Sequence, residues 1–214
     1  MMEEELSTRE RRALRTREAI LDAARQIISR QGADALSMRA IAKAIDYSPA
    51  GLYEYFGSKE EIVGAVCYQG HARLTQYMER ADASLPPDEH LIELGLAYID
   101  FAVRNPDFFL LMFANPSTGV KPGFGPDEAV AEMSDDGSSF GLLLAAIQRG
   151  IDAGVYVTRP GYGLLEMAYG AWSLVHGMAM LRIGHLTHFP MDYTTAEREN
   201  LRRFGQGLMA QDGA

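Results

Sequence analysis

The chain has 214 residues, enough for one large or two small domains, and its 47% hydrophobic and 23% charged content is ordinary for a globular protein. A single cysteine, Cys67, excludes an internal disulfide and a zinc site of paired cysteines. The net charge is −9, yet residues 6–59 hold ten Lys and Arg against six Asp and Glu, net +4, while residues 60–214 hold ten against twenty, net −10. A nucleic acid needs positive charge only where the protein touches its phosphates, and the protein as a whole need not be basic. Residues 6–59 are therefore the candidate region for contact with a nucleic acid.

The first expected helix begins at Ser7, where Ser7-Thr8-Arg9-Glu10 has capping-box spacing, or as late as Thr16, and it ends at Gly32. Arginines crowd its first turns, at positions 9, 11, 12, 15 and 17. Such a charge run is either a solvated face or a set of phosphate contacts, and for Arg9 and Arg11 both readings stay open.

Residues 37–56 are expected to form two short helices joined by a tight turn. Ser37 is a good N-cap for the first helix, and Ser48 followed by Pro49 starts the second. Asp46 lies between them and is one of the few non-glycine residues that tolerate a left-handed backbone. In the second helix Leu52 and Phe56, four residues apart, face inward. Small and aromatic side chains are left outside, at Pro49, Ala50, Gly51 and Tyr53, together with Glu54.

This stretch resembles the helix-turn-helix of the TetR family of bacterial transcription regulators. The matching residues are Ile41-Ala42, Ser48 to Gly51, Leu52-Tyr53, Phe56 and Ser58-Lys59-Glu60. The resemblance covers residues 14–74. It departs from the family pattern at Asp46, where the family usually has glycine, and at Glu54, an acid on the supposed DNA face.

The resemblance implies that this region binds double-stranded DNA. Small residues let the second helix approach a base edge or a phosphate, and tyrosine, lysine and arginine side chains donate hydrogen bonds to phosphates. The expected DNA-contacting residues are Arg12, Thr16, Arg17, Ser37, Met38, Arg39, Tyr47, Ser48, Pro49, Ala50, Gly51, Tyr53, Tyr55 and Lys59.

The rest of the chain is also expected to be helical. A second capping box at Ser58 predicts a long helix to about Ala83, and Pro86-Pro87 mark a domain boundary. Further helices are expected over residues 88–104, 106–113, 127–154 (with a break at 135–137), 162–184 and 194–209, with a loop over 115–126. The helix over 162–184 is apolar nearly all round, so one side needs a partner, and Val175 is assigned to that outer side.

The same helix carries Trp172-x-x-x-His176-Gly177, which resembles the Trp-His-Gly element of one TetR subgroup. The tryptophan and the histidine lie on one helix face. They either touch a ligand or fill the core with the histidine bonded to a backbone carbonyl, and both readings stay open. The residues expected to line an apolar effector site are Tyr98, Phe101, Phe108, Met112, Phe140, Met167, Trp172 and His176.

No catalytic site, metal site or cofactor is expected. His185 and His188 lack further ligands at metal-binding spacing. Glu93, Asp100 and Glu166 have no base or nucleophile paired with them, and there is no phosphate-binding glycine loop.

The predicted fold is therefore all-α, with an N-terminal three-helix helix-turn-helix DNA-binding head (domain 14–74, helix-turn-helix 37–56) and a C-terminal helical ligand-binding and dimerisation domain (84–210). The resemblance implies a homodimeric repressor, built through helices 162–184 and 194–209 and released from a palindromic operator by a small apolar effector. The alternatives are an activator, a ligand-independent regulator, or a small-molecule-binding protein that keeps the head.

A cytoplasmic location is expected. There is no signal-peptide apolar segment, and the longest run without a full charge, residues 167–181, is shorter than the roughly 20 residues that a membrane span needs.

Overall fold

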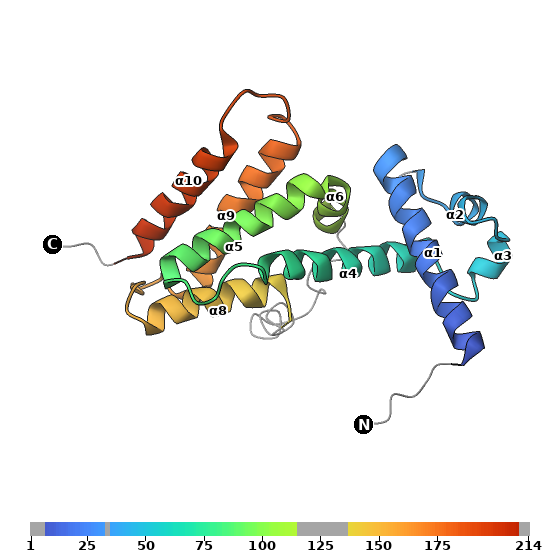
Figure 1. Ribbon diagram of the computed structural model, residues 1–214, viewed down its shortest axis with the longest axis horizontal. Helices are drawn as coiled ribbons and strands as arrows, with labels where there is room; N and C mark the ends of the chain where they lie inside the picture. Colours follow the sequence, from blue (N-terminus) through green and yellow to red (C-terminus); the bar gives the residue numbers. More distant parts are fainter. Residues whose placement is uncertain (1–6, 33–34, 115–136, 210–214) are drawn as a thin grey trace. The chain divides into compact units, whose positions relative to one another are not determined.

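The protein is helical throughout the computed structural model, which describes residues 7–32, 35–114 and 137–209. Those residues form nine helices, drawn in chain order in Figure 1. The helices are α1 (Thr8–Gln31), α2 (Met38–Ala44), α3 (Pro49–Leu52), α4 (Lys59–Met78), α5 (Pro87–Arg104), α6 (Pro106–Ala114), α8 (Ser139–Asp152), α9 (Leu164–Ile183) and α10 (Tyr193–Leu208). The described part has two isolated β-bridges and no strand, so the all-α prediction is confirmed.

The chain divides into two compact units. The N-terminal unit comprises residues 1–70 and 110–118, and the C-terminal unit comprises residues 71–109 and 119–214. The loop expected over 115–126, and the first part of the helix expected over 127–154, lie outside the described residues. Among the described helices, none is both long enough and apolar enough to cross a lipid bilayer.

Helix α1 begins at the earlier of its two expected starts. The Ser7 hydroxyl accepts a hydrogen bond from the Glu10 N–H (3.3 Å), and the Glu10 carboxylate accepts one from the Ser7 N–H (2.8 Å), which completes the capping box. The helix ends at Gly32, whose φ of 83° lies in the left-handed region that favours glycine. The apolar residues that α1 buries in the N-terminal unit include Ile20, Leu21, Ala24, Ile27 and Ile28.

Helix α4 is shorter than expected: it ends at Met78, whereas the sequence predicted an end near Ala83. The guanidinium of Arg149, on α8, donates hydrogen bonds to the carbonyl oxygens of Ala83 and Leu85 (3.0 Å for Leu85). These two carbonyls are therefore held by a side chain more than 60 residues away in the sequence. The sequence of residues 79–86 alone does not indicate that Arg149 binds this segment.

Helix α5 is the centre of the C-terminal unit, since it packs against α8, α9 and α10 (Figure 1). Gly95 allows its close approach to two neighbours. A Cβ atom at this position would lie 3.0 Å from Cδ1 of Leu201, on α10, and 3.2 Å from Cγ1 of Val175, on α9. An alanine here would push both neighbours away, so the small residue determines how tightly the three helices meet.

The outward assignment of Val175 is wrong, because its side chain is buried and only 7% exposed. The large apolar side chains that α9 leaves exposed in the single chain are Leu165, Tyr169, Met180 and Leu181. Since α9 is apolar nearly all round, hydropathy alone could not show which side meets its own core. The contact with α5 at Gly95 decides it.

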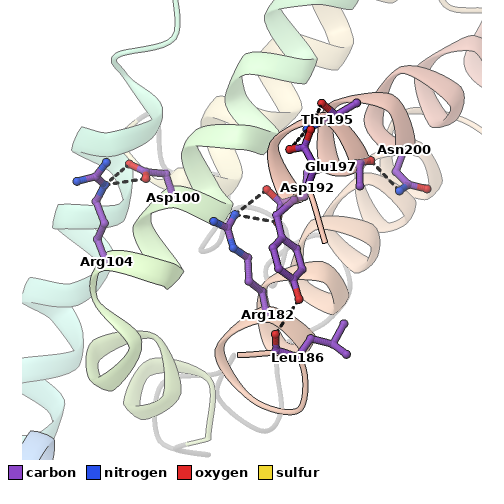
Figure 2. Close-up of polar contacts among 10 residues, drawn as sticks. Asp100, Arg104, Arg182, Leu186, Asp192, Thr195, Glu197 and Asn200 are labelled. Atoms are coloured by element: carbon purple, nitrogen blue, oxygen red, sulfur yellow. Dashed lines mark hydrogen bonds and ion pairs between the residues drawn. The ribbon is translucent and has the colours of Figure 1, made fainter. Parts of the chain in front are cut away.

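Helices α9 and α10 are joined by a buried ion pair (Figure 2). Nη1 of Arg182 lies 3.0 Å and 2.8 Å from the two carboxylate oxygens of Glu197. The Glu197 side chain is only 7% exposed and that of Arg182 is 29% exposed. Burial raises the pKa of Glu197, although Arg182 acts in the opposite direction. The Tyr193 hydroxyl donates to the Leu186 carbonyl oxygen (2.7 Å), which closes the connection between the two helices.

The unequal burial of this pair predicts unequal costs of substitution. Arg182→Met leaves the Glu197 carboxylate buried without its cation and should lower the free energy of unfolding by about 3 kcal/mol. Glu197→Gln keeps a hydrogen-bond acceptor, and Arg182 reaches water, so its cost should be about 1 kcal/mol. Urea unfolding followed by circular dichroism measures both.

Urea unfolding measured at several pH values tests whether the buried charge of Glu197 is the cause of this cost. Because the pKa of Glu197 is raised by folding, the ionised carboxylate costs stability as pH rises through its titration, and without Arg182 this cost grows. The penalty of Arg182→Met should therefore be smaller at pH 4 than at pH 7. Equal costs for the two variants at pH 7 would contradict this account.

Candidate functional site

The turn between α2 and α3 has the geometry that its residues predict. The Ser37 hydroxyl accepts from the Ala40 N–H (3.1 Å), and the Ser48 hydroxyl accepts from the Gly51 N–H (3.0 Å), so both predicted N-caps are confirmed. Asp46 has a φ of 53° and is, among the described residues, the one non-glycine residue in the left-handed region. Each capping hydroxyl accepts with its oxygen and keeps its hydrogen for an outside acceptor.

Helix α3 has one buried side and one open side. The helix ends at Leu52 and is therefore shorter than predicted, and Phe56 lies beyond it. Leu52 and Phe56 are nevertheless both buried, as predicted, while Pro49, Ala50 and Tyr53 are exposed. The open side is thus made of small residues at the N-terminus of the helix and an aromatic residue after it. Among the expected cations of this face Arg39 is exposed and Lys59 is half-buried.

Tyr47 covers Gly51 from the turn. A Cβ atom on Gly51 would lie 2.6 Å from Cε1 of Tyr47, closer than real side chains approach each other. The Tyr47 ring meets that of Tyr55 edge-on, with ring centres 6.2 Å apart. A hydrogen bond with Tyr55 raises the pKa of Tyr47, whereas the charge of Arg12 acts to lower it. Gly51 is therefore required by the position of Tyr47 as well as by any approach of DNA.

Arg17 has a role that the sequence did not reveal. Its Nη1 donates to the Tyr55 carbonyl oxygen (2.8 Å), and its Cζ lies 4.0 Å from the centre of the Phe56 ring. It thus ties α1 to the segment that follows α3, across 38 residues of sequence. The Thr16 hydroxyl donates to the Arg12 carbonyl oxygen (3.1 Å).

A second candidate site lies in the C-terminal unit, where three side chains meet at one hydroxyl. The Trp172 indole Nε1 donates to the Tyr98 oxygen (3.1 Å), and the same oxygen lies 2.9 Å from Nδ1 of His176. An indole N–H only donates, so the Tyr98 hydrogen is left for His176 Nδ1, which then accepts as the neutral Nε2–H tautomer. Burial lowers the pKa of His176 and raises that of Tyr98, which favours these neutral forms. The structural reading of His176 expected a hydrogen bond to a backbone carbonyl. In the structure Nδ1 of His176 bonds to the side-chain hydroxyl of Tyr98.

Aromatic rings surround this three-residue network. Phe109 is fully buried and stacks on the His176 ring, with centres 5.2 Å apart, and Phe140 lies 5.8 Å from Trp172. Phe109 was not among the expected site residues, although it lies in the aromatic stretch of α6 that sequence analysis selected. The stacking partner is 67 positions further along the chain, so only the fold identifies it.

The other expected ligand-binding residues have different surroundings. Phe101 packs edge-on against Tyr77, with ring centres 5.4 Å apart, and Met167 belongs to the buried core around Ile147 and Tyr156, against which Trp172 and Phe140 also pack. Phe108 is half-buried, and Met112 belongs to the N-terminal unit. Within the part of the chain that the structure describes, no group of three or more His, Cys, Asp and Glu side chains is placed to hold a metal ion.

Comparison with known proteins covers both units. Residues 20–66 match the family model of bacterial regulatory proteins of the tetR family, and residues 91–203 match that of the tetracyclin repressor-like C-terminal domain. The chain is 34% identical over 91 residues to the HTH-type transcriptional regulator UidR of Escherichia coli (strain K12), a match that covers 42% of this chain and 40% of UidR. It therefore spans less than half of UidR's length.

Two further similarities extend over more of the chain. The HTH-type transcriptional repressor NicS of Pseudomonas putida is 25% identical over 157 residues, 73% of each protein. A solved structure of a protein with unknown function from Rhodococcus sp. RHA1 aligns with a TM-score of 0.74 and 24% identity, covering 91% of this chain and 95% of that one. The structural likeness shows that the two share a fold.

The contact between Tyr47 and Gly51 predicts the effect of one added methyl group. Gly51→Ala should force the Tyr47 ring off its position and weaken binding to duplex DNA at least about tenfold, since it disturbs the face that approaches the major groove. The free energy of unfolding should change by less than about 1 kcal/mol, because Tyr47 is a surface side chain that can rotate away. Gly64→Ala is the matched control, because a Cβ at Gly64 has no neighbour within 4 Å. Equal DNA affinity for both variants would contradict the assigned role of Gly51.

The hydrogen bonds at Tyr98 predict a pH-dependent signal from Trp172, the single tryptophan of the chain. Because folding lowers the pKa of His176, its contribution to stability is present above about pH 6.5 and is lost as pH falls through the lowered value. Protonation turns Nδ1 into a donor and displaces the Tyr98 hydrogen. Trp172 emission should therefore change with a midpoint below pH 6.5, and His176→Gln should abolish this change. The pKa of His90 is also lowered by burial, so His90→Gln is the control that should leave the Trp172 titration intact.

Proposed function

Because this chain belongs to the TetR family of DNA-binding transcriptional regulators, we propose that it is a homodimeric repressor, released from a palindromic operator when a small apolar effector binds its C-terminal unit. The observation that carries the proposal is the open side of α3, where small residues precede an exposed aromatic residue and two capped helix starts are held by a tight turn. Such a helix enters the major groove with its N-terminal residues towards the bases.

The proposed division of labour follows the predicted domains. Residues 14–74, together with Arg12 just before them, contact DNA through the fourteen side chains named from the sequence, and residues 84–210 bind the effector and form the dimer. Arg17 combines a phosphate contact with its structural contact to Tyr55 and Phe56. Repression is supported by the similarity to NicS, which is named a transcriptional repressor. A protein that acts on the chromosome works in the cytoplasm of a bacterium, and we place it there.

The proposed dimer uses the face of α9 that its own chain leaves open. Tyr169 and Leu165 are exposed there, and so is Gly177, which has no neighbour within 4 Å of its Cβ position. Exposed apolar side chains beside a small residue allow a second helix to pack closely. A two-fold dimer would then present two α3 helices to two half-sites about one helical turn apart.

The proposed effector site lies beside the hydrogen-bonded network of Tyr98, Trp172 and His176, and we assign the C-terminal unit to the Trp-His-Gly subgroup on these residues. Phe109 and Phe140 make its surroundings apolar and aromatic. The effector lowers DNA affinity if it binds more tightly to a state in which the two heads no longer match the half-site spacing. The network supplies hydrogen-bonding groups that an apolar ligand with one polar end can use.

The dimer predicts that one charge on the open face of α9 abolishes operator binding. Tyr169→Glu should give a folded monomer, because a partner would bury the carboxylate without a cation, and a monomer loses the half-site pairing. Tyr68→Glu is the matched control, since Tyr68 on α4 is 77% exposed and Tyr169 is 71% exposed. Sedimentation velocity gives the oligomeric state, and footprinting on a duplex enriched from a random library gives the site. An intact dimer of Tyr169→Glu, or a wild-type footprint on one asymmetric half-site, would contradict the proposal.

The effector site predicts a coupling between two measurements. A panel of small apolar compounds is screened for a change in Trp172 emission, and compounds that bind should also raise the melting temperature by mass action. Those compounds should weaken binding to the enriched duplex, and by linkage the duplex should weaken their binding by the same factor. Phe140→Ala should reduce the affinity of such a compound, whereas Tyr68→Ala should not. A compound that binds at Trp172 and leaves DNA affinity unchanged would contradict regulation through this site.

A further inference from the structure

The first turns of α1 carry a cluster of arginines outside the residues that match the DNA-binding family model. The match begins at residue 20, whereas α1 begins at Thr8. Residues 7–17 contain five arginines and one glutamate, a net charge of +4. Four of these arginines have exposed side chains, and we call them the arginine arm: Arg9, Arg11, Arg12 and Arg15.

The single acid in this segment does not neutralise the arm. The Glu10 carboxylate is bonded to the Ser7 N–H, and hydrogen bonds with Ser7 lower its pKa. Among the described residues, the arm arginines form no ion pair, and Arg11 donates one hydrogen bond to the Thr8 hydroxyl (3.3 Å). The capping box thus stabilises the N-terminus of α1, and the guanidinium groups next to it remain exposed to solvent.

Several other arginines of the described helices are paired with acids. Arg25, further along α1, pairs with Asp22, and Arg104 of α5 pairs with Asp100, each within one turn of its helix. Two arginines of α10, at positions 202 and 203, likewise share Glu199. Several exposed arginines of this chain therefore have an acidic partner within one helical turn. Within the arm, arginines lie three and four residues apart, at 9/12, 12/15 and 11/15, and like charges at this spacing destabilise a free helix. Glu18 follows Arg15 by three residues, but the two form no ion pair in the described structure.

The arm continues the DNA face of the head. Arg17, the next arginine of α1, donates to the Tyr55 carbonyl oxygen (2.8 Å) just after α3, so the first turns of α1 adjoin this face. At 100° per residue, positions 11, 12 and 15 fall within one 100° sector of α1, so three guanidinium groups share a side of the helix. A row of cations on one side of a helix fits a row of phosphates.

We propose that the arginine arm binds the phosphate backbone of duplex DNA outside the base pairs read by α3, and so adds affinity without sequence preference. The inference rests on the proposed DNA-binding function and concerns residues beyond the matched domain. Thr8 to Arg15 extends for about 12 Å at 1.5 Å per residue. Duplex DNA offers one phosphate per ~1.7 Å of axis, so each arginine has phosphates within its reach.

The test is a salt titration of duplex binding with the full chain. The probes are a fluorescein-labelled duplex enriched from a random library and a random-sequence duplex of the same length, followed by anisotropy. The variant R9A/R11A/R15A should lower the slope of log Kd against log salt by about 2 to 3 per protomer, since each lost phosphate contact is worth about 0.9. Both duplexes should lose the same factor, so the ratio of their affinities stays constant. Alanine is the best helix former, and circular dichroism should show α1 intact.

Two further variants separate charge from structure. R9K/R11K/R15K keeps three point charges and should keep the wild-type slope. R30A/R73A removes two exposed arginines outside the arm and should also keep it. A wild-type slope for R9A/R11A/R15A would overturn the role of the arm and leave the proposed function standing. A wild-type protein that binds neither duplex would overturn both.

Discussion

The reading head depends on a reversal of the chain within four residues, between the end of α2 and the start of α3. The reversal requires a left-handed backbone at Asp46, with a φ of 53°, and the Ser48 hydroxyl then accepts from the N–H of Gly51, the third residue of the new helix. That geometry brings Tyr47 over Gly51, and Tyr47 in turn meets Tyr55. The position of every side chain on the open side of α3 follows from this turn. Arg17 of α1 stabilises the segment after α3 by donating a hydrogen bond to the Tyr55 carbonyl oxygen.

The C-terminal unit is organised by close approach and by a few buried polar contacts. Gly95 lets α5 meet α9 and α10, and the pair of Arg182 and Glu197 ties the end of α9 to the beginning of α10. About one turn after Gly95 on α5, the Tyr98 hydroxyl bonds to Trp172 and His176 together. The rings of Phe109 and Phe140 pack against this network, so a change of protonation there alters the surroundings of Trp172. This makes the network a suitable reporter of whatever binds beside it.

Charge is used differently in the two parts of the chain. Arginines of the C-terminal unit are mostly paired, as in the contact of Arg198 with Glu93 (2.6 Å) between α10 and α5, and they act as links within the protein. Those at the start of α1 have no carboxylate partner among the described residues. The net charge of −9 conceals this division, since the acids outnumber the bases where ion pairs are needed and are scarce where the phosphate backbone is the proposed partner.

Sequence by itself determined the all-α fold, the two capped helices around Asp46 and the inward positions of Leu52 and Phe56, because each depends on residues within one or two helical turns. Tertiary structure decided what depends on distant partners. The segment after α4 is held by Arg149 through the Leu85 carbonyl, the inner side of the uniformly apolar α9 is determined by its contact with Gly95, and Phe109 stacks on His176 from another helix. Local patterns encode propensity and spacing, whereas these contacts join residues tens of positions apart and exist only once the chain has folded.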